Sequence, residues 1–356
     1  MSYLKLEVSK KHYPFLDGFR ALSILGVLLH HIEKAFNLAP FLGEYFYIFR
    51  PIAQLGILGV DMFFVISGFL ITGLLIDTNA NTIDIRRFYL RRMFKIFPQY
   101  FFAVACGVAI TLILNSGEIN QKVIPYKLFL SYFFFLQNYI GGVPVLLHGW
   151  SLAVEEHFYL FYPVAFYLIW RYQKDPLKRR RFLLTRIIVC IILLNIFRFY
   201  HLYISDVGPF DFQKTHFRCD ALLFGGFIKL LEPNIIDFSR NQKRWLSIIC
   251  FSLGMVIFLW FIKHGYQTLL WPTFTLAYMA PWFLIVSALT GYFPLEKIIN
   301  NRFLRGIGKD SYGIYLWHYI IIITVTSLHW HYNVLLAAVG CAMASILFGS
   351  FMTRTL

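Results

Sequence analysis

The amino-acid sequence predicts an all-α integral membrane protein with about ten transmembrane helices. Of its 356 residues, 58% are hydrophobic and only 14% are charged, whereas a typical soluble domain carries about 25% charged residues. Apolar runs of spanning length recur along most of the chain, and short polar segments rich in Lys and Arg separate them. Because no hydrophilic segment of domain size interrupts this pattern, we expect residues 1–356 to form a single membrane-embedded domain without a fused soluble domain.

The positions of the apolar runs define the expected spans and one ambiguous segment. The expected spans are residues 16–36, 52–76, 95–115, 150–170, 183–203, 217–232, 245–264, 269–289, 310–329 and 333–352. Residues 125–140 form an eleventh apolar candidate.

Basic clusters decide how the ambiguous segment is counted, because Lys and Arg concentrate in cytoplasmic loops. The clusters are Lys5/Lys10/Lys11, Arg86–Lys95, Arg171–Arg186, Arg240–Arg244 and Lys297–Lys309. With ten spans and a cytoplasmic N-terminus, all of these clusters fall inside. If 125–140 also crossed the membrane, the last three clusters would fall outside. We therefore expect ten spans, both termini in the cytoplasm, and an outer loop or re-entrant segment at 125–140.

The formal net charge of +15 is explained mainly by this topological bias, so no nucleic-acid partner is expected. The five cysteines are scattered and include no CxxC pair. Neither a disulfide framework nor a metal site is therefore expected.

Ionisable residues within spans are costly and by default indicate function. In the first span, Arg20 and His31 are eleven residues apart. That separation places them about 20° apart around a helix and about 16 Å apart along it, so they share one face. The alternative for His31 is an interfacial histidine satisfied by a neighbour.

The second span contains Asp61, which lies near its outer end and is either functional or simply hydrated. Gly68 and Thr72 follow Asp61 along the same helical face. For Gly68, close packing against another helix is the favoured interpretation.

The segment before the third span reads RRFYLRRMFKIFPQY. Its Arg91, Arg92 and Lys95 suit the capture of phosphate groups, and topological charge is an equally good explanation. Arg92 and Lys95 are three residues apart, so one helix face presents both.

The fourth span places Ser151, Glu155 and Tyr159 on one face by i, i+4, i+8 spacing. A carboxylate in such a site can act as an acid or base, or orient a histidine. Two consecutive glutamates are not expected to face the core together, and Glu155 is preferred over Glu156 because it aligns with Ser151 and Tyr159.

Two later spans add candidates. Arg218 and Asp220 lie near the outer end of the sixth span, where a salt bridge to each other or to neighbours is expected. In the ninth span, Ser311, Tyr315 and His318 share a face.

Together these motifs resemble the membrane acyltransferase 3 family. Arg20 and His31 match its Arg/Lys-x10-His signature. The further matching segments are GVDMFFVISGFLIT, FYLRRMFKIFP, FFFLQNY, GWSLAVEEHFYLFYP, FRCDALLFGG and IGKDSYGIYLWH. Two positions depart from the family pattern: Lys95 stands where Arg is usual, and His157 replaces a common Gln.

The resemblance implies a multi-pass acyltransferase of the bacterial inner membrane. Such proteins move an acyl group, usually acetyl from acetyl-CoA, onto a hydroxyl of a cell-surface carbohydrate or glycolipid, without a bound cofactor. It also implies that His31 is catalytic, as a general base or a transient acyl carrier, and that Arg20 and the basic segment bind the donor. We expect Glu155 to hold the His31 imidazole in one tautomer.

The acceptor stays open among exopolysaccharide, lipopolysaccharide, peptidoglycan and small glycosides. Two other classes also remain. A multi-span transporter or exporter of a polysaccharide precursor also places Arg, His and Glu inside a bundle, with broken helices at matched positions. A non-catalytic sensor or assembly protein would tolerate the loss of Arg20 and His31.

Overall fold

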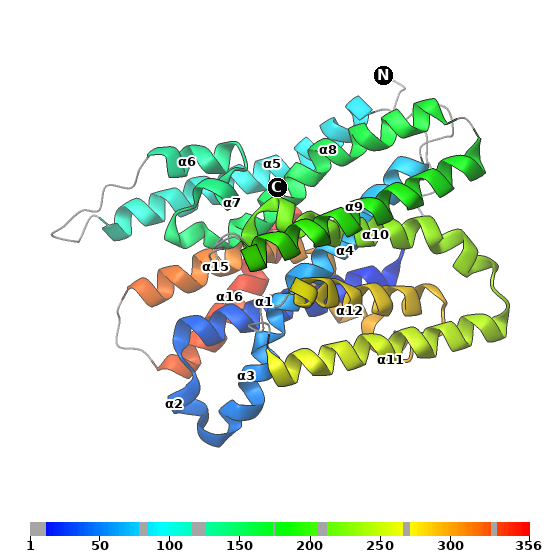
Figure 1. Ribbon diagram of the computed structural model, residues 1–356. Helices are drawn as coiled ribbons and strands as arrows, with labels where there is room; N and C mark the ends of the chain where they lie inside the picture. Colours follow the sequence, from blue (N-terminus) through cyan, green and yellow to red (C-terminus); the bar gives the residue numbers. More distant parts are fainter. Residues whose placement is uncertain are drawn as a thin grey trace.

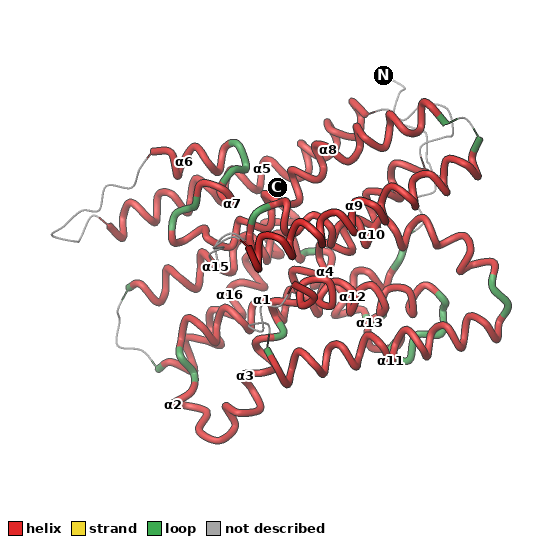
Figure 2. Tube along the Cα trace, in the orientation of Figure 1, coloured by secondary structure: helices red, strands yellow, loops and turns green. Residues whose placement is uncertain are grey.

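Long helices run side by side through the molecule, as the computed structural model shows (Figures 1 and 2). The structure describes residues 12–77, 85–115, 126–173, 175–204, 212–265, 271–328 and 333–356. Each of the ten expected spans overlaps one long helix over most of its described residues, and the second span also includes residues 52–54 of a preceding short helix. The long helices are α1 (Pro14–Phe36), α4 (Gly56–Asp77), α5 (Ile85–Asn115), α8 (Trp150–Tyr172), α9 (Pro176–Ile204), α10 (Thr215–Asp237), α11 (Arg240–His264), α12 (Trp271–Leu289), α15 (Ser311–Ser327) and α16 (Val334–Thr355).

Shorter helices fill the connections between them. They are α2 (Ala39–Leu42), η1 (Gly43–Tyr45), α3 (Phe46–Gln54), α6 (Tyr126–Phe133), α7 (Gln137–Ile140), η2 (Pro144–Gly149), α13 (Glu296–Ile299) and α14 (Arg302–Lys309). All regular structure within the described residues is helical, which confirms the predicted all-α class.

Six helical stretches in the described part of the chain are long and apolar enough to cross a membrane. They are Pro14–Phe36, Ala39–Ile76, Ile85–Leu114, Lys178–His201, Arg240–His264 and Val334–Thr355. The other long helices are shorter or more polar: α15 has 17 residues, and α8 and α10 carry several charged side chains. The count of ten spans and the side on which the termini lie stay predictions.

The basic segment before the third span is helical rather than a loop. Residues from Ile85 onward form the first turns of the 31-residue helix α5, which runs on through Pro98. No glycine or proline interrupts the residues between Ile85 and Pro98, so nothing stops helix formation there. As predicted from their spacing, Arg92 and Lys95 lie on a common face, since both line the cavity described below.

The ambiguous segment 125–140 is broken, as expected of a non-spanning segment. Helix α6 has eight residues and is therefore about 12 Å long, well short of the roughly 30 Å hydrocarbon core. Phe135 has a φ of 56°, which ends the helical path before α7. The side-chain amide of Gln137 then donates to the Gly149 carbonyl at 2.8 Å and so ties α7 to the last residue of η2, directly before α8.

Glycines allow the close helix packing that shapes the core. A Cβ added at Gly68 of α4 would lie 1.8 Å from the Leu222 carbonyl oxygen of α10, and one added at Gly225 would lie 1.9 Å from the Val65 carbonyl oxygen. The backbones of α4 and α10 therefore touch, which confirms the packing interpretation of Gly68.

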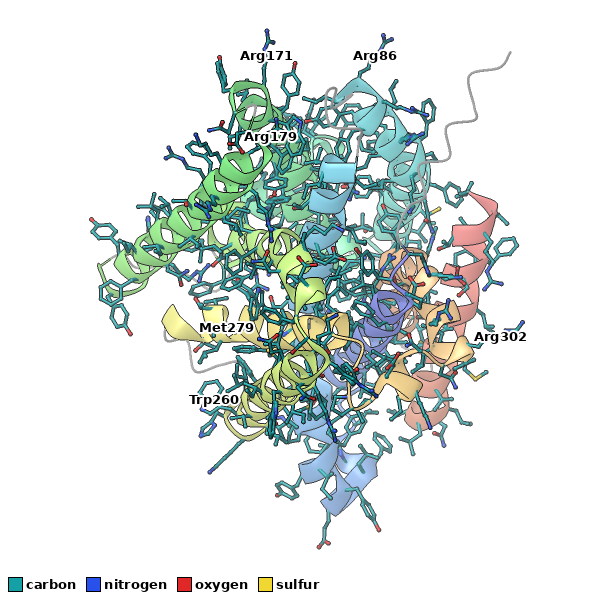
Figure 3. The ribbon with its side chains drawn as sticks, turned by 90° about the vertical axis from the view of Figure 1, so that its right-hand side faces the viewer. Arg86, Arg171, Arg179, Trp260, Met279 and Arg302 are labelled. Carbon is teal, nitrogen blue, oxygen red and sulfur yellow. The ribbon has the colours of Figure 1, made fainter. Side chains whose placement is uncertain are left out.

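Several helix ends that carry basic residues lie at one end of the bundle. The start of α5, the end of α8, and the starts of α9 and α11 lie toward the right in Figure 1, and Figure 3, which faces that end, shows Arg86, Arg171 and Arg179 on one side of it. The cluster Lys5, Lys10 and Lys11 lies outside the described residues.

Candidate active site

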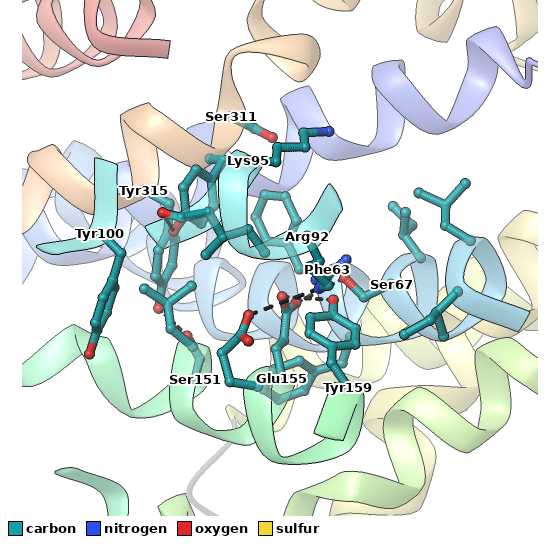
Figure 4. A pocket seen from close by; sticks show the side chains of 18 of the residues that line it. Phe63, Ser67, Arg92, Lys95, Tyr100, Ser151, Glu155, Tyr159, Ser311 and Tyr315 are labelled. Atoms are coloured by element: carbon teal, nitrogen blue, oxygen red, sulfur yellow. Dashed lines mark hydrogen bonds and ion pairs between the residues drawn. The ribbon is translucent and has the colours of Figure 1, made fainter. Parts of the chain in front are cut away.

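A cavity of about 170 Å³ lies between α1, α4, α5, α8 and α15 (Figure 4). Phe63, Phe64, Leu70, Ile71 and Leu152 contribute to its apolar walls. Its polar lining comprises Arg20, Ser67, Arg92, Lys95, Tyr100, Ser151, Glu155, Glu156, Tyr159, Ser311, Tyr312 and Tyr315. The fold thus brings predicted residues from the first, third and fourth spans to one place.

Two carboxylates from α8 point into this cavity. Glu155 accepts hydrogen bonds from the Ser67 hydroxyl at 2.9 Å and from the Tyr159 hydroxyl at 3.0 Å. Ser151, Glu155 and Tyr159 all line the cavity, so the predicted shared face is confirmed.

Glu156 also lines the cavity, which corrects the expectation that only one of the two glutamates faces inward. Its carboxylate lies 4.0 Å from the Nε of Arg92. Helix α8 packs against both α4 and α5, which border the same cavity. Adjacent residues on α8 are 100° apart, so both glutamates can reach this cavity from different sides of the helix.

The basic side chains at the start of α5 lie on two surfaces, the cavity and the outer surface of the helix. The guanidinium of Arg92 stacks over the Tyr159 ring, 3.1 Å from the ring centroid, inside the cavity. Lys95 lines the cavity as well as the outer surface of α5, and Arg91 lies only on that outer surface, beside Arg87. Arg20 enters the cavity from α1, so the first span also supplies a cation here.

His31 lies in a cluster of imidazoles next to the cavity rather than in its lining. Its Nδ1 is 3.0 Å from His318 Nε2, and the Nδ1 of His318 is 2.6 Å from the Tyr315 carbonyl oxygen. Tyr319 packs edge-on against the His31 ring. The expectation that Glu155 holds this imidazole is therefore wrong: Glu155 is bonded to Ser67 and Tyr159, and the partner of His31 is His318.

Tyr315 connects the cavity with the imidazole cluster. Its hydroxyl lies 2.6 Å from the Ser151 hydroxyl and donates to the His148 carbonyl at 2.9 Å. Its backbone carbonyl holds His318, and its ring contacts the rings of both His148 and His318. The predicted i, i+4, i+7 face of α15 is confirmed: Ser311 and Tyr315 line the cavity, and His318 lies beyond them.

Sequence reasoning missed His148, Ser67 and Glu156. His148 directly precedes the GWSLAVEEHFYLFYP motif, and its Nε2 lies 3.2 Å from the Leu316 carbonyl oxygen. A histidine at the entry of a polar span is a signal that could have identified it. Ser67 lies within an apolar run and gave no signal in the sequence, because a serine in a transmembrane helix commonly bonds to a backbone carbonyl of its own helix.

The remaining predicted candidates form buried ion pairs away from the cavity. Arg218 Nη2 lies 2.5 Å from Asp61, and Arg198 Nη2 lies 2.6 Å from Asp220. Arg218 and Asp220 therefore bond to neighbouring helices and not to each other. Asp61 has no exposed surface, so its hydrated interpretation is wrong.

Comparison with known proteins gives the same family as the motifs. A family model described as an acyltransferase domain matches residues 13–354. The chain is 30% identical over 335 residues to O-acetyltransferase OatA of Staphylococcus aureus strain NCTC 8325 / PS 47, covering 90% of this chain and 52% of that protein. A putative O-acetyltransferase of strain COL is 29% identical over 333 residues, covering 89% of this chain and 52% of its own length.

The chain thus spans about half the length of the curated relatives that it matches. No solved structure matches it. Since the family model extends over nearly the whole chain, this protein belongs to the membrane acyltransferase 3 family.

Proposed function

We propose that this protein is a membrane O-acyltransferase. It moves an acyl group, most simply acetyl, from acetyl-CoA to a hydroxyl of a cell-surface carbohydrate or lipid-linked sugar. One observation carries the proposal: a cavity with three cationic side chains, Arg20, Arg92 and Lys95, ends at Tyr315 beside the pair of His31 and His318. The names of the relatives, both O-acetyltransferases, support the same reaction class.

The cationic side chains supply the donor-binding part of the proposal. Coenzyme A carries phosphates, and guanidinium and ammonium groups bind phosphate oxygens through charge-assisted hydrogen bonds. Arg92 and Lys95 lie in the first third of α5, whose start lies at the same end of the bundle as the basic ends of α8, α9 and α11. We propose that this end faces the cytoplasm of a bacterial inner membrane, where acetyl-CoA is available.

The histidine cluster supplies the chemistry. Acyl transfer to a hydroxyl needs a base for the acceptor proton and donors for the developing oxyanion. His31 is the proposed base or transient acyl carrier. Ser151 and Tyr315 carry the hydroxyl groups that lie between the cavity and the imidazoles. In this proposal Glu155 is a cavity residue toward the donor, not the partner of His31.

The test compares three proteins in membranes of a strain that lacks the native gene: wild type, His31→Ala and His264→Ala. His264 is exposed at the end of α11, where its Nδ1 bonds to the Trp260 carbonyl of the same helix, so it is a matched histidine control. Transfer of labelled acetyl from acetyl-CoA to surface glycans, measured by mass spectrometry, is expected for wild type and His264→Ala only. Full transfer by a folded His31→Ala protein would exclude His31 from the reaction.

A further inference from the structure

We infer that His318 is a positioning residue that fixes the tautomer of His31, so that His31 Nε2 presents its lone pair to the reactants. This inference deepens the function proposed above and rests on it. It assigns to an imidazole the orienting role that the sequence assigned to Glu155.

The first step fixes the proton on His318. Its Nδ1 lies 2.6 Å from the Tyr315 carbonyl oxygen, and a carbonyl only accepts hydrogen bonds. The proton of this contact is therefore on His318 Nδ1. The His318 side chain has no exposed surface and its ring packs against His31, His148 and Tyr315. A second proton would bury a charge among these groups, so the ring is neutral and its Nε2 is an acceptor.

The second step transfers this constraint to His31. The contact of 3.0 Å between His318 Nε2 and His31 Nδ1 needs one proton between two nitrogens. Since His318 Nε2 is the acceptor, the proton lies on His31 Nδ1. A neutral imidazole carries one N–H, so His31 Nε2 has a free lone pair. His31 is partly exposed, whereas His318 has no exposed surface, so of these two rings only that of His31 is accessible.

His148 supports the orientation of His318 from the other side. Its Nε2 donates to the Leu316 carbonyl at 3.2 Å, and its ring lies 5.2 Å from the His318 ring and 5.1 Å from the Tyr319 ring. Consecutive carbonyls of α15, at residues 315 and 316, thus hold both imidazoles. The ring of His318 is fixed by packing and hydrogen bonding at the same time.

The lone pair then enters a balanced reaction. His31 Nε2 takes the proton of the acceptor hydroxyl, and the oxygen forms a C–O bond with the thioester carbonyl carbon. The tetrahedral intermediate collapses, the C–S bond breaks, and the thiolate takes the proton from His31 Nε2. The products are the acyl ester and the coenzyme A thiol, and His31 returns to its neutral tautomer. Transient acylation of His31 would need the same lone pair.

Two variants with side chains of similar size, His318→Gln and His318→Met, test whether His318 fixes the tautomer of His31. Both are measured in full-length protein reconstituted in nanodiscs. Gln at position 318 keeps an acceptor close to the position of the imidazole Nε2, whereas Met has a similar shape and only a weak acceptor. With acetyl-CoA and glycans extracted from a deletion strain, we expect His318→Met to lower kcat about 100-fold. The KM for acetyl-CoA should stay within about twofold, and His318→Gln should recover about tenfold of the lost kcat.

Equal kcat values for His318→Gln and His318→Met would overturn the positioning role of His318. A His318→Met variant that raises the KM for acetyl-CoA and leaves kcat unchanged would overturn it too. Nitrogen-15 NMR of histidine-labelled wild type, with the His31 signal identified from its absence in His31→Ala, gives a readout without catalysis. Protonated Nδ1 and bare Nε2 on His31 are expected, and protonated Nε2 would overturn the inference. Failure of wild type to transfer acetyl would contradict the proposed function alone.

Discussion

At the scale of single residues, neighbouring cations on α5 have separate environments. Arg92 lies in the cavity over Tyr159, whereas Arg91 lies on the outer surface of the helix. We expect Arg92→Gln to raise the KM for acetyl-CoA by about tenfold or more, because a hydrogen bond to a charged group contributes about 1.5–3 kcal/mol. Arg91→Gln is the matched control and should change KM by less than about twofold. Initial-rate kinetics on both proteins measure the difference, and equal effects would contradict donor binding in the cavity.

Local spacing predicted which side chains share a face, but not which distant side chains meet. Ser151, Glu155 and Tyr159 could be grouped because helical periodicity is a property of the chain itself. The partner of His31 could not be predicted in this way. His318 is 287 residues away, and the contact exists only because α15 packs against α1. The carboxylate of Glu155 was expected as the partner, and the structure places the imidazole of His318 there instead.

At the scale of elements, the close contact of α4 and α10 gives a stability prediction. We expect Gly68→Ala to destabilise the protein by about 1–3 kcal/mol, because the added methyl group overlaps the Leu222 carbonyl and the helices must separate. Gly340 of α16 is the control, since nothing lies within 4 Å of an added Cβ there. Thermal unfolding in detergent should show a melting temperature below that of wild type for Gly68→Ala and no such decrease for Gly340→Ala. A melting temperature of Gly68→Ala equal to wild type would contradict the backbone contact.

The ion pair of Arg218 with Asp61 joins α10 to α4 within the core. Removal of one partner deprives a buried charge of its ion pair, which costs about 3–5 kcal/mol, whereas replacement of both by apolar groups is often close to neutral. We therefore expect Asp61→Leu and Arg218→Met each to lower the melting temperature more than the double variant does. A double variant that is as unstable as the sum of the two single variants would show that the pair is not coupled.

Hydropathy predicted the existence of the helices better than their ends. The runs near 16–36 and 333–352 match the ends of α1 and α16 to within three residues. The start of α5 was placed ten residues late, since charged residues were assigned to a loop although they favour helices. Helices α8 and α10 carry charged side chains that pair with neighbouring helices inside the bundle, so hydropathy alone underestimates how deeply these helices are buried.

At the scale of the whole molecule, the arrangement predicts which ends of the helices face each side of the membrane. With ten spans and a cytoplasmic N-terminus, Tyr47 and Tyr126 lie outside, and Arg171 and Arg244 lie inside. All four side chains are exposed, so cysteines at these positions should react when the reagent has access to them. An impermeant maleimide on intact spheroplasts should label Tyr47→Cys and Tyr126→Cys, and should label Arg171→Cys and Arg244→Cys only after permeabilisation. Wild type, with its five native cysteines, gives the background. Labelling of Tyr126→Cys and Arg171→Cys from the same side would mean that α8 does not cross the membrane or that 125–140 crosses it as well, and the predicted separation of donor and acceptor sides would then fail.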